Sequence, residues 1–217
     1  MPTILASELI TKVRTLVQDP SAIRWSDSEL LGWINDGQRE IATIRSDAST
    51  KYSSARLVAG TLQSMPSDAI ELIDIPRNMG TDGATPGYPV RKVERSFLDE
   101  NIPTWHTDAA SNVTRHFAYD TKALRNYWVY PPSDGTGYLN LLYSFSPVDL
   151  PNTASVIGVD DIYHNALMFY VLSMAWAKNA DDPGDTQRSA TARQSFENSL
   201  AAKSQTDETN VRDPKGA

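Results

Sequence analysis

The stretch DDIYHNALMFYVLSMAWAK, residues 160–178, is the most apolar long segment of the chain, and it decides how the rest must fold. Its apolar side chains leave almost no polar stripe, so a helix here needs cover on most of its circumference, with Trp176 inside the core. At about 1.5 Å per residue the helix would span roughly 28 Å, which is also the length of a membrane crossing. His164, Asn165 and Ser173 lie within it, however, and charged residues stand at both ends. These features favour a central helix buried in protein.

Two amphipathic helices are predicted before this segment. Apolar residues recur at helical spacing over residues 3–17. Ser26 followed by Glu29 is a capping box, which predicts that a second helix begins at Asp27. Gly37 falls in the apolar stripe of that helix, where it either admits a close neighbour or simply costs stability, and packing is the favoured interpretation.

A fourth helix is predicted over residues 186–203, with a thin apolar stripe on an otherwise polar surface. Residues 205–217 have too little apolar surface to offset the entropy of ordering, which predicts a flexible C-terminal tail.

Between the helix pairs the chain has short segments rich in β-branched and aromatic residues, separated by turns containing Pro and Gly. These segments predict about six strands, over residues 56–63, 69–75, 90–97, 115–119, 127–130 and 138–145. The loop at residues 79–89, which contains three glycines, is expected to be mobile.

The two helix pairs need each other's apolar faces, which predicts an α+β fold: an antiparallel bundle of four helices with an inserted antiparallel β domain. The expected boundaries are 1–50 and 155–204 for the helical bundle domain, 51–154 for the β domain and 205–217 for the tail.

Composition narrows the possible functions. The 217 residues contain no cysteine, which excludes disulfides, thiolate metal sites and cysteine nucleophiles. A net charge of -7 argues against a chain whose main task is to grip nucleic acid by its phosphates. The first ten residues have no basic region, so a secreted precursor is not expected.

The residues that could carry catalysis do not form a recognisable constellation. His106, His116 and His164 lie in different contexts without metal-ligand spacing, and neither a nucleophile elbow nor a phosphate-binding loop is present. We therefore expect no enzyme activity, no catalytic residues, no metal and no cofactor. The alternative is a small hydrolase that uses His116 or His164 with a nearby carboxylate.

One concentration of basic residues could form a contact surface. Arg77, Arg91, Lys92 and Arg95 flank the glycine loop and are candidates for contact with an acidic neighbour or with passing DNA. The alternative is a solvated strand face.

Five aromatic residues are interpreted as the core of a β-sandwich, with a stacking platform for bases or sugars as the alternative. They are Tyr127, Trp128, Tyr130, Tyr138 and Tyr143.

The order of several motifs resembles a known family. They are WSDSELLGWINDGQREIATIRSDAS (25–49), GTLQSMPSDAIELIDIPRNMG (60–80), VRKVERSFLDENIPTWH (90–106), YWVYPP (127–132) and VDDIYHNALMFYVLSMAWAKNAD (159–181). This set, within residues 4–200, resembles the head-tail adaptor (connector) proteins of tailed bacteriophages and is distantly similar to tubular tail protein A.

The resemblance implies a structural virion protein of the neck or tail, assembled in the host cytoplasm and not in a membrane. It would form a twelvefold ring under the portal protein, extend the DNA channel and dock a downstream tail or nozzle protein. Genomic DNA would pass through without sequence-specific binding. The alternative function is a carbohydrate- or receptor-binding β module of a phage tail.

In the resembled family the C-terminal end reaches towards the portal. This implies portal-binding residues in the tail, and the candidates are Gln205, Thr206, Asp207, Asn210, Val211, Arg212 and Pro214.

Overall fold

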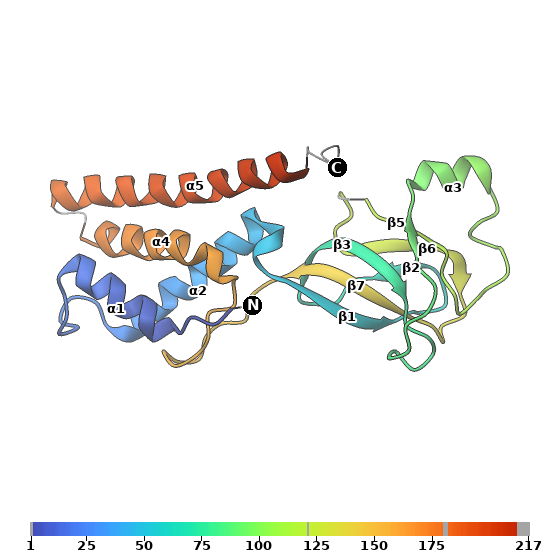
Figure 1. Cartoon of the computed structure of the whole chain (residues 1–217), viewed down its shortest axis with the longest axis horizontal. Helices are drawn as coiled ribbons and strands as arrows, with labels where there is room; N and C mark the ends of the chain where they lie inside the picture. The colour runs from blue at the N-terminus through green and yellow to red at the C-terminus, as the bar shows by residue number, and fades with distance from the viewer. Residues whose placement is uncertain (1, 121, 180–181, 212–217) are drawn as a thin grey trace. The chain divides into compact units, whose positions relative to one another are not determined.

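The computed structural model describes residues 2–120, 122–179 and 182–211, with side chains described as far as residue 202. The chain is α+β, as predicted, and divides into two compact units (Figure 1). The helical unit consists of Met1–Ser49 and Pro147–Ala217, and the β unit consists of Thr50–Ser146.

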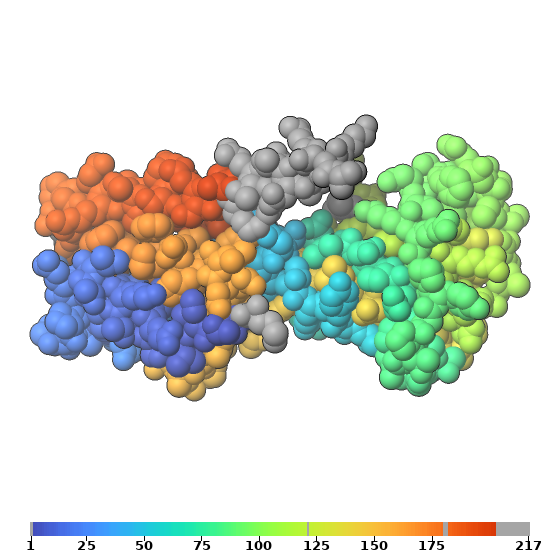
Figure 2. Space-filling view, in the orientation of Figure 1, coloured from blue at the N-terminus to red at the C-terminus, as the bar shows by residue number. Residues whose placement is uncertain are grey.

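The helical unit is built from helices at both ends of the chain. Its elements are α1 (Ala6–Val17), α2 (Asp27–Ile44), α4 (His164–Ala177) and α5 (Pro183–Val211), with short 3-10 turns η1 (Ser46–Ala48) and η2 (Asp161–Tyr163). Helix α4 contacts each of the other three helices, and on the face shown in Figure 2 it lies between α1 and α5. None of the described helices combines the length and the apolarity that a membrane crossing requires.

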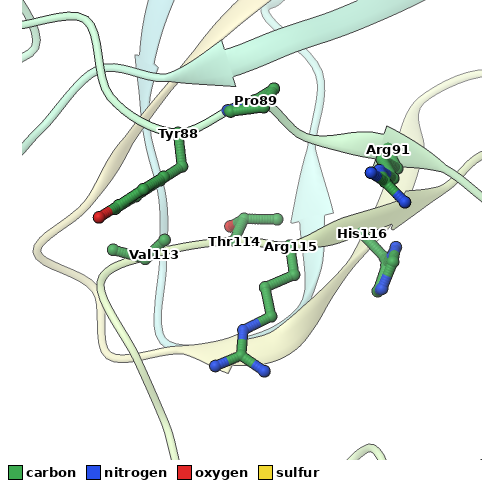
Figure 3. A pocket seen from close by; sticks show the side chains of 7 residues that line it. All are labelled: Tyr88, Pro89, Arg91, Val113, Thr114, Arg115 and His116. Atoms are coloured by element: carbon green, nitrogen blue, oxygen red, sulfur yellow. The ribbon is translucent and has the colours of Figure 1, made fainter.

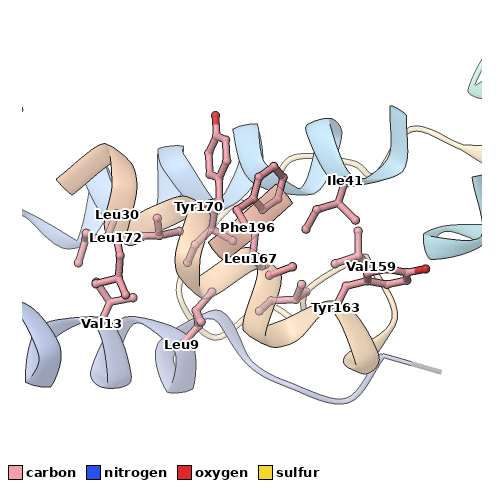
Figure 4. Packing of buried hydrophobic residues seen from close by; sticks show 14 of the residues in the cluster. Leu9, Val13, Leu30, Ile41, Val159, Tyr163, Leu167, Tyr170, Leu172 and Phe196 are labelled. Carbon is pink, nitrogen blue, oxygen red and sulfur yellow. The ribbon is translucent and has the colours of Figure 1, made fainter. Parts of the chain in front are cut away.

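One apolar cluster joins the four helices (Figure 4). Its fully buried side chains include Leu9 and Val13 of α1, Leu30 and Ile41 of α2, Leu167 of α4 and Phe196 of α5. Complete burial of each such side chain stabilises the folded state by about 1.5–3 kcal/mol. The pairs of helices separated by the β unit in the sequence therefore share a single core.

Helix α2 follows its sequence signals closely. The Ser26 hydroxyl accepts a hydrogen bond from the Glu29 backbone N–H at 3.3 Å, which confirms the predicted N-terminal cap. Gly37 lies where α2 meets α4, and a Cβ there would stand 2.6 Å from Leu167 Cδ1. The interpretation of Gly37 as a close-packing position is therefore confirmed.

The connection between α1 and α2 is organised by a buried arginine. Arg14 is only 9% exposed, and its Nη2 donates to the Trp25 carbonyl at 2.8 Å and to Asp27 Oδ1 at 2.6 Å. Its Nη1 donates to the Asp19 carbonyl at 3.2 Å. A guanidinium with several partners of this kind tolerates burial because its charge and its donors are both satisfied.

Helix α4 is less completely covered than its sequence predicts. It begins at His164 after the turn η2, and Phe169 and Trp176 are only partly buried. The two rings line a groove of about 250 Å³ beside α5. The expectation that Trp176 is fully buried is wrong because α5 presents small and polar residues here, such as Thr191 and Ser195.

Helix α5 extends beyond its predicted end near residue 203, to Val211. The sequence has no glycine or proline between Gly184 and Pro214, so nothing in it stops the helix sooner. Part of the predicted tail is therefore helical, and residues 212–217 lie outside the described residues. The flexibility of the tail stays a prediction.

The β unit contains two sheets. Its strands are β1 (Thr50–Arg56), β2 (Gly60–Ser64), β3 (Ala69–Asn78), β4 (Arg91–Lys92), β5 (His116–Ala118), β6 (Asn126–Ser133) and β7 (Tyr138–Phe145). The strand orders are β1-β7-β3 and β2-β6-β5-β4, and β4 pairs with β5 in parallel. The prediction of a purely antiparallel domain is therefore wrong for this one pair.

Two further differences from the predicted strands have local causes. The segment predicted as a strand over residues 90–97 turns into helix α3 (Arg95–Asn101), since RSFLDEN contains good helix formers and an Arg95–Asp99 pair at i,i+4. The segment predicted over residues 56–63 is divided between β1 and β2, and β1 begins in the polar run at Thr50 because β7 supplies its pairing partner.

Side chains from both sheets meet in one core, which includes Leu72, Ile75, Phe117, Val129 and Leu141. A smaller cluster on the other face of β6 contains Leu98 of α3, Trp105 and Ala118.

The five aromatic residues are distributed between these clusters. Tyr127 and Tyr143 belong to the main core, Trp128 and Tyr130 pack against the smaller cluster, and Tyr138 is half-buried. This arrangement favours the interpretation as core over that of an exposed stacking platform.

Candidate functional site

The four basic residues singled out in the sequence occupy different elements of the β unit. Arg77 lies on β3, Arg91 and Lys92 lie on β4, and Arg95 begins α3. Arg95 pairs with Asp99 at 3.5 Å and lies over the Trp128 ring, 5.0 Å from its centroid. Arg91 lines a cleft of the β unit whose lining includes none of the other three.

The cleft has a volume of about 580 Å³ and lies beside the parallel strand pair β4 and β5 (Figure 3). Its lining consists of Tyr88, Pro89, Arg91, Val113, Thr114, Arg115 and His116. Tyr88, Pro89 and Val113 provide the apolar part of the wall, while Arg91, Arg115 and His116 provide the nitrogen atoms.

Strand pairing brings the backbones of Arg91 and Arg115 together, while Figure 3 shows their side chains directed apart. Arg91 is the register partner of His116, and its backbone N–H donates to the Arg115 carbonyl at 3.0 Å. The Arg115 N–H in turn donates to the Tyr130 carbonyl of β6 at 2.8 Å. Sequence reasoning missed Arg115, because a parallel pairing across more than twenty residues leaves no periodic signal.

A buried asparagine holds the two rims of the cleft. Asn78 is 3% exposed, and its Nδ2 donates to the Tyr88 carbonyl at 2.9 Å and to the Thr114 carbonyl at 2.8 Å. Its Oδ1 accepts from the Thr114 N–H at 2.8 Å. The segments that carry Tyr88 and Arg115 are therefore fixed to the same side chain, which preorganises the cleft.

The glycine loop that leads into the cleft has more internal hydrogen bonds than its composition suggests. Asp82 accepts from the Thr85 hydroxyl at 2.7 Å and from the N–H groups of Ala84 and Thr85, each at 3.0 Å. The Thr85 side-chain bond, followed by these backbone bonds, lowers the pKa of Asp82 to about 2. Mobility of this loop stays a prediction, but its turn is locally ordered.

The electrostatics of the cleft favour an anion. Arg91 and Arg115 are exposed, and neither forms an ion pair with another described residue. Burial, followed by the charges of these two arginines, lowers the pKa of His116 below its ordinary value. His116 Nδ1 is buried and has no hydrogen-bond partner in the described part of the chain. The cleft thus presents two unneutralised positive charges beside a neutral imidazole.

The other histidines have partners of their own. His106 Nδ1 lies 2.8 Å from the Thr61 hydroxyl, and His164 Nε2 lies 3.1 Å from Lys12 Nζ. Neither His116 nor His164 has a hydrogen bond to a carboxylate of another described residue, which is the arrangement that the hydrolase alternative requires. Within the described ranges, no group of three His, Asp or Glu side chains comes together in a way that could hold a metal ion.

The candidate portal-binding residues lie at the far end of α5. Gln205, Thr206, Asp207, Asn210 and Val211 fall on the helical backbone, beyond the last described side chain. Arg212 and Pro214 lie outside the described residues.

Comparison with known protein families gives a match over nearly the whole chain. The model of a family described as SU10 adaptor protein matches residues 4–215, which include nearly all of both units. No curated protein matches the chain.

Proposed function

Because the chain belongs to the SU10 adaptor protein family, a family of phage head-tail adaptors, we propose that it forms a ring between the portal protein and the tail. The ring would contain about twelve copies in closed cyclic symmetry, extend the DNA channel and dock a downstream tail or nozzle protein. The family match over residues 4–215 carries this proposal.

Membership in this family makes the chain a phage virion component that associates with other virion proteins. We propose a structural, non-enzymatic role in the neck. The helical residues 1–50 and 155–204 would act as one antiparallel bundle, with residues 51–154 as an inserted domain and 205–217 as an adaptable end.

Partly exposed apolar surface supports assembly into a larger structure. Phe169 and Trp176 line a groove on the helical unit, beside Leu172 and Ala192. Apolar rings on a surface are usually found where a partner covers them. In the proposed ring, a neighbouring copy would cover this groove.

The negative net charge of the chain supports a channel that lets DNA pass without sequence-specific binding. A net charge of -7 gives the chain little general affinity for phosphates, and tight DNA binding needs several basic contacts along the backbone. In the proposed ring, weak contact suits a channel through which the genome passes.

The portal contact is assigned to the C-terminal end of the chain. Gln205, Thr206, Asp207, Asn210 and Val211 follow the last buried residue of α5 that is described, Leu200. With Arg212 and Pro214 they are the proposed portal-binding residues. Many copies of a weak contact on one ring would together give firm attachment.

Imaging the purified chain mixed with its cognate portal protein by electron microscopy tests the proposal. The expected result is a second ring of density on one face of the portal, absent when the portal is imaged alone. A portal that remains bare at saturating adaptor concentration would overturn the proposal.

The alternative function, a carbohydrate- or receptor-binding β module, is tested separately by applying the chain to immobilised glycans. We expect no retention, because the aromatic residues that would form its platform are largely committed to packing in the β unit. Specific retention of one glycan together with a bare portal would favour the alternative.

A further inference from the structure

Arg91 and His116 form a pair on one face of the sheet β2-β6-β5-β4. They are register partners on the parallel strands β4 and β5, and partners in register direct their side chains to the same face of a sheet. Figure 3 shows both at the same end of the cleft, while the Arg115 side chain is directed away from Arg91. Neighbouring strands lie about 4.8 Å apart, so the two side chains can reach a common group.

The His116 ring is held in one orientation. It lies nearly parallel to the Tyr130 ring, at 14°, with the ring centroids 6.2 Å apart, and the Tyr130 hydroxyl donates to Asp108 Oδ2 at 3.0 Å. His116 Nδ1 is buried and has no hydrogen-bond partner in the part of the chain that the structure describes. Nε2 is therefore the ring nitrogen that can meet a ligand in the cleft, which His116 lines.

The positive charges around His116 are not balanced. The described residues that line the cleft include no Asp or Glu, and the Arg91 guanidinium has neither an ion pair nor a hydrogen bond to another described residue. Burial, followed by the charges of Arg91 and Arg115, lowers the pKa of His116. An anion beside Arg91 would offset these charges and favour the protonated imidazole.

We propose that Arg91 and His116 together bind one oxyanion, which is a carboxylate or a phosphate-like group. The planar guanidinium of Arg91 donates paired hydrogen bonds to the oxygens of the anion, and His116 Nε2 donates a further one. Because the anion favours the charged imidazole, its binding is coupled to proton uptake by His116. The affinity therefore rises as the pH falls through the titration of His116, and it levels off once the free chain is protonated too.

NMR titration of the histidine rings tests the site in the full-length chain. At constant ionic strength, replacing chloride by sulfate should raise the titration midpoint of His116 by at least about half a pH unit, which is about threefold tighter binding by the protonated ring. His106 and His164 do not line the cleft, and their midpoints should move by less than about 0.1 pH unit. An unchanged His116 midpoint, or equal changes in all three rings, would overturn the proposal.

Two matched variants distinguish this site from a general attraction of anions. R91Q and R115Q each remove one positive charge near His116, so each should raise its midpoint in chloride. In R91Q the further rise caused by sulfate should fall to less than about a fifth of that in the original chain, because the guanidinium that shares the anion is absent. R115Q should retain more than about half of the rise. Equal losses in the two variants would contradict a site built from Arg91 and His116.

A second probe identifies the chemistry of the bound group. A larger midpoint change with sulfate than with formate assigns a phosphate-like group, whereas a larger change with formate assigns a carboxylate, and either result supports the site. Arg91 and Arg115 are exposed, so both variants are expected to fold.

This inference goes beyond the proposed ring and does not depend on it, because the site lies within the β unit of one chain. The titration uses the free chain and needs no portal protein. Its failure would leave the adaptor ring in place, and a bare portal would leave the oxyanion site in place.

Discussion

At the scale of single residues, the two glycines of α2 show how context decides the effect of one methyl group. A Cβ at Gly37 would stand 2.6 Å from Leu167 Cδ1 and 2.7 Å from Tyr170 Cδ1, both on α4. A Cβ at Gly32 would meet nothing within 4 Å. Both positions are helical, so alanine gains the same intrinsic helix propensity at each.

We therefore expect opposite effects from the same substitution. Gly37→Ala should lower the free energy of unfolding by about 1–3 kcal/mol through overpacking against α4. Gly32→Ala should raise it by about 0.5–1 kcal/mol. Urea unfolding of the two variants measures both, and a stabilising Gly37→Ala would show that α4 can move away from α2 at little cost.

His164 links α1 to α4 and should make stability depend on pH. Burial, followed by the charge of Lys12, lowers the pKa of His164, while Asp161 and Glu8 act in the opposite direction. The unfolded chain, with an ordinary histidine pKa of about 6.5, takes up a proton before the folded chain does. The free energy of unfolding should therefore decrease as pH falls below about 6.5, and this contribution should level off below the folded pKa.

The measurement is a comparison of urea midpoints for the original chain and for His164→Gln between pH 7.5 and 5. The original should lose more stability over this range than the variant, because the variant has no group to protonate at this position. Equal slopes would mean that His164 titrates in the folded chain as it does in the unfolded one.

At the scale of elements, strong local sequence signals predicted the helices correctly. Elements that depend on pairing with distant residues were not predicted. The cap at Ser26 and the apolar periodicity of α1 and α2 place these helices within a few residues of their true bounds. Helix α3 was missed because its seven residues show less than two turns of periodicity. Strand β1 was missed because its polar residues acquire a strand conformation only by pairing with β7.

The residues of the candidate site show the same difference between local and non-local signals. Arg91 could be found from the local density of basic residues, but its partner Arg115 depends on the parallel pairing of β4 with β5. The clamp formed by Asn78 depends on contacts with residues 10 and 36 positions away. No spacing rule in the sequence contains these contacts.

The Asn78 clamp gives a prediction for the β unit. Asn78→Ala removes the side-chain hydrogen bonds to Tyr88 and Thr114, and it leaves the N–H and the carbonyl of the buried Thr114 without these partners. We expect a loss of about 2–4 kcal/mol in the free energy of unfolding. Asn112→Ala, at an exposed position, is the control and should cost less than about 0.5 kcal/mol. Thermal unfolding compares the two, and equal melting temperatures would contradict a clamping role.

At the scale of the whole molecule, the end of α5 should be separable from the fold. The described buried apolar side chains of α5 are Ala192, Phe196 and Leu200, all before residue 205. Deletion of residues 205–217 should therefore shift the melting temperature by less than about 2 °C while weakening attachment to the portal. A chain that ends before Phe196 is the control and should unfold at a clearly lower temperature.

Two results would contradict this prediction. Normal portal attachment by the chain that lacks residues 205–217 would show that the portal contact lies elsewhere in the chain. A large fall in its melting temperature would show that the end of α5 belongs to the core.

The pairing of β1 with β7 has a consequence for the order in which the chain folds during synthesis. Helices α1 and α2 leave the ribosome more than one hundred residues before α4, the helix that they share a core with. Closing a loop of this length costs about 4 kcal/mol in chain entropy. In the folded β unit Thr50 is paired with Ser144, so the two points where the chain passes between the units are held at the distance of neighbouring strands. If the β unit folds first, it therefore brings the start of the segment that contains α4 close to the end of α2. The helices of the helical unit then need to find each other only over a short distance.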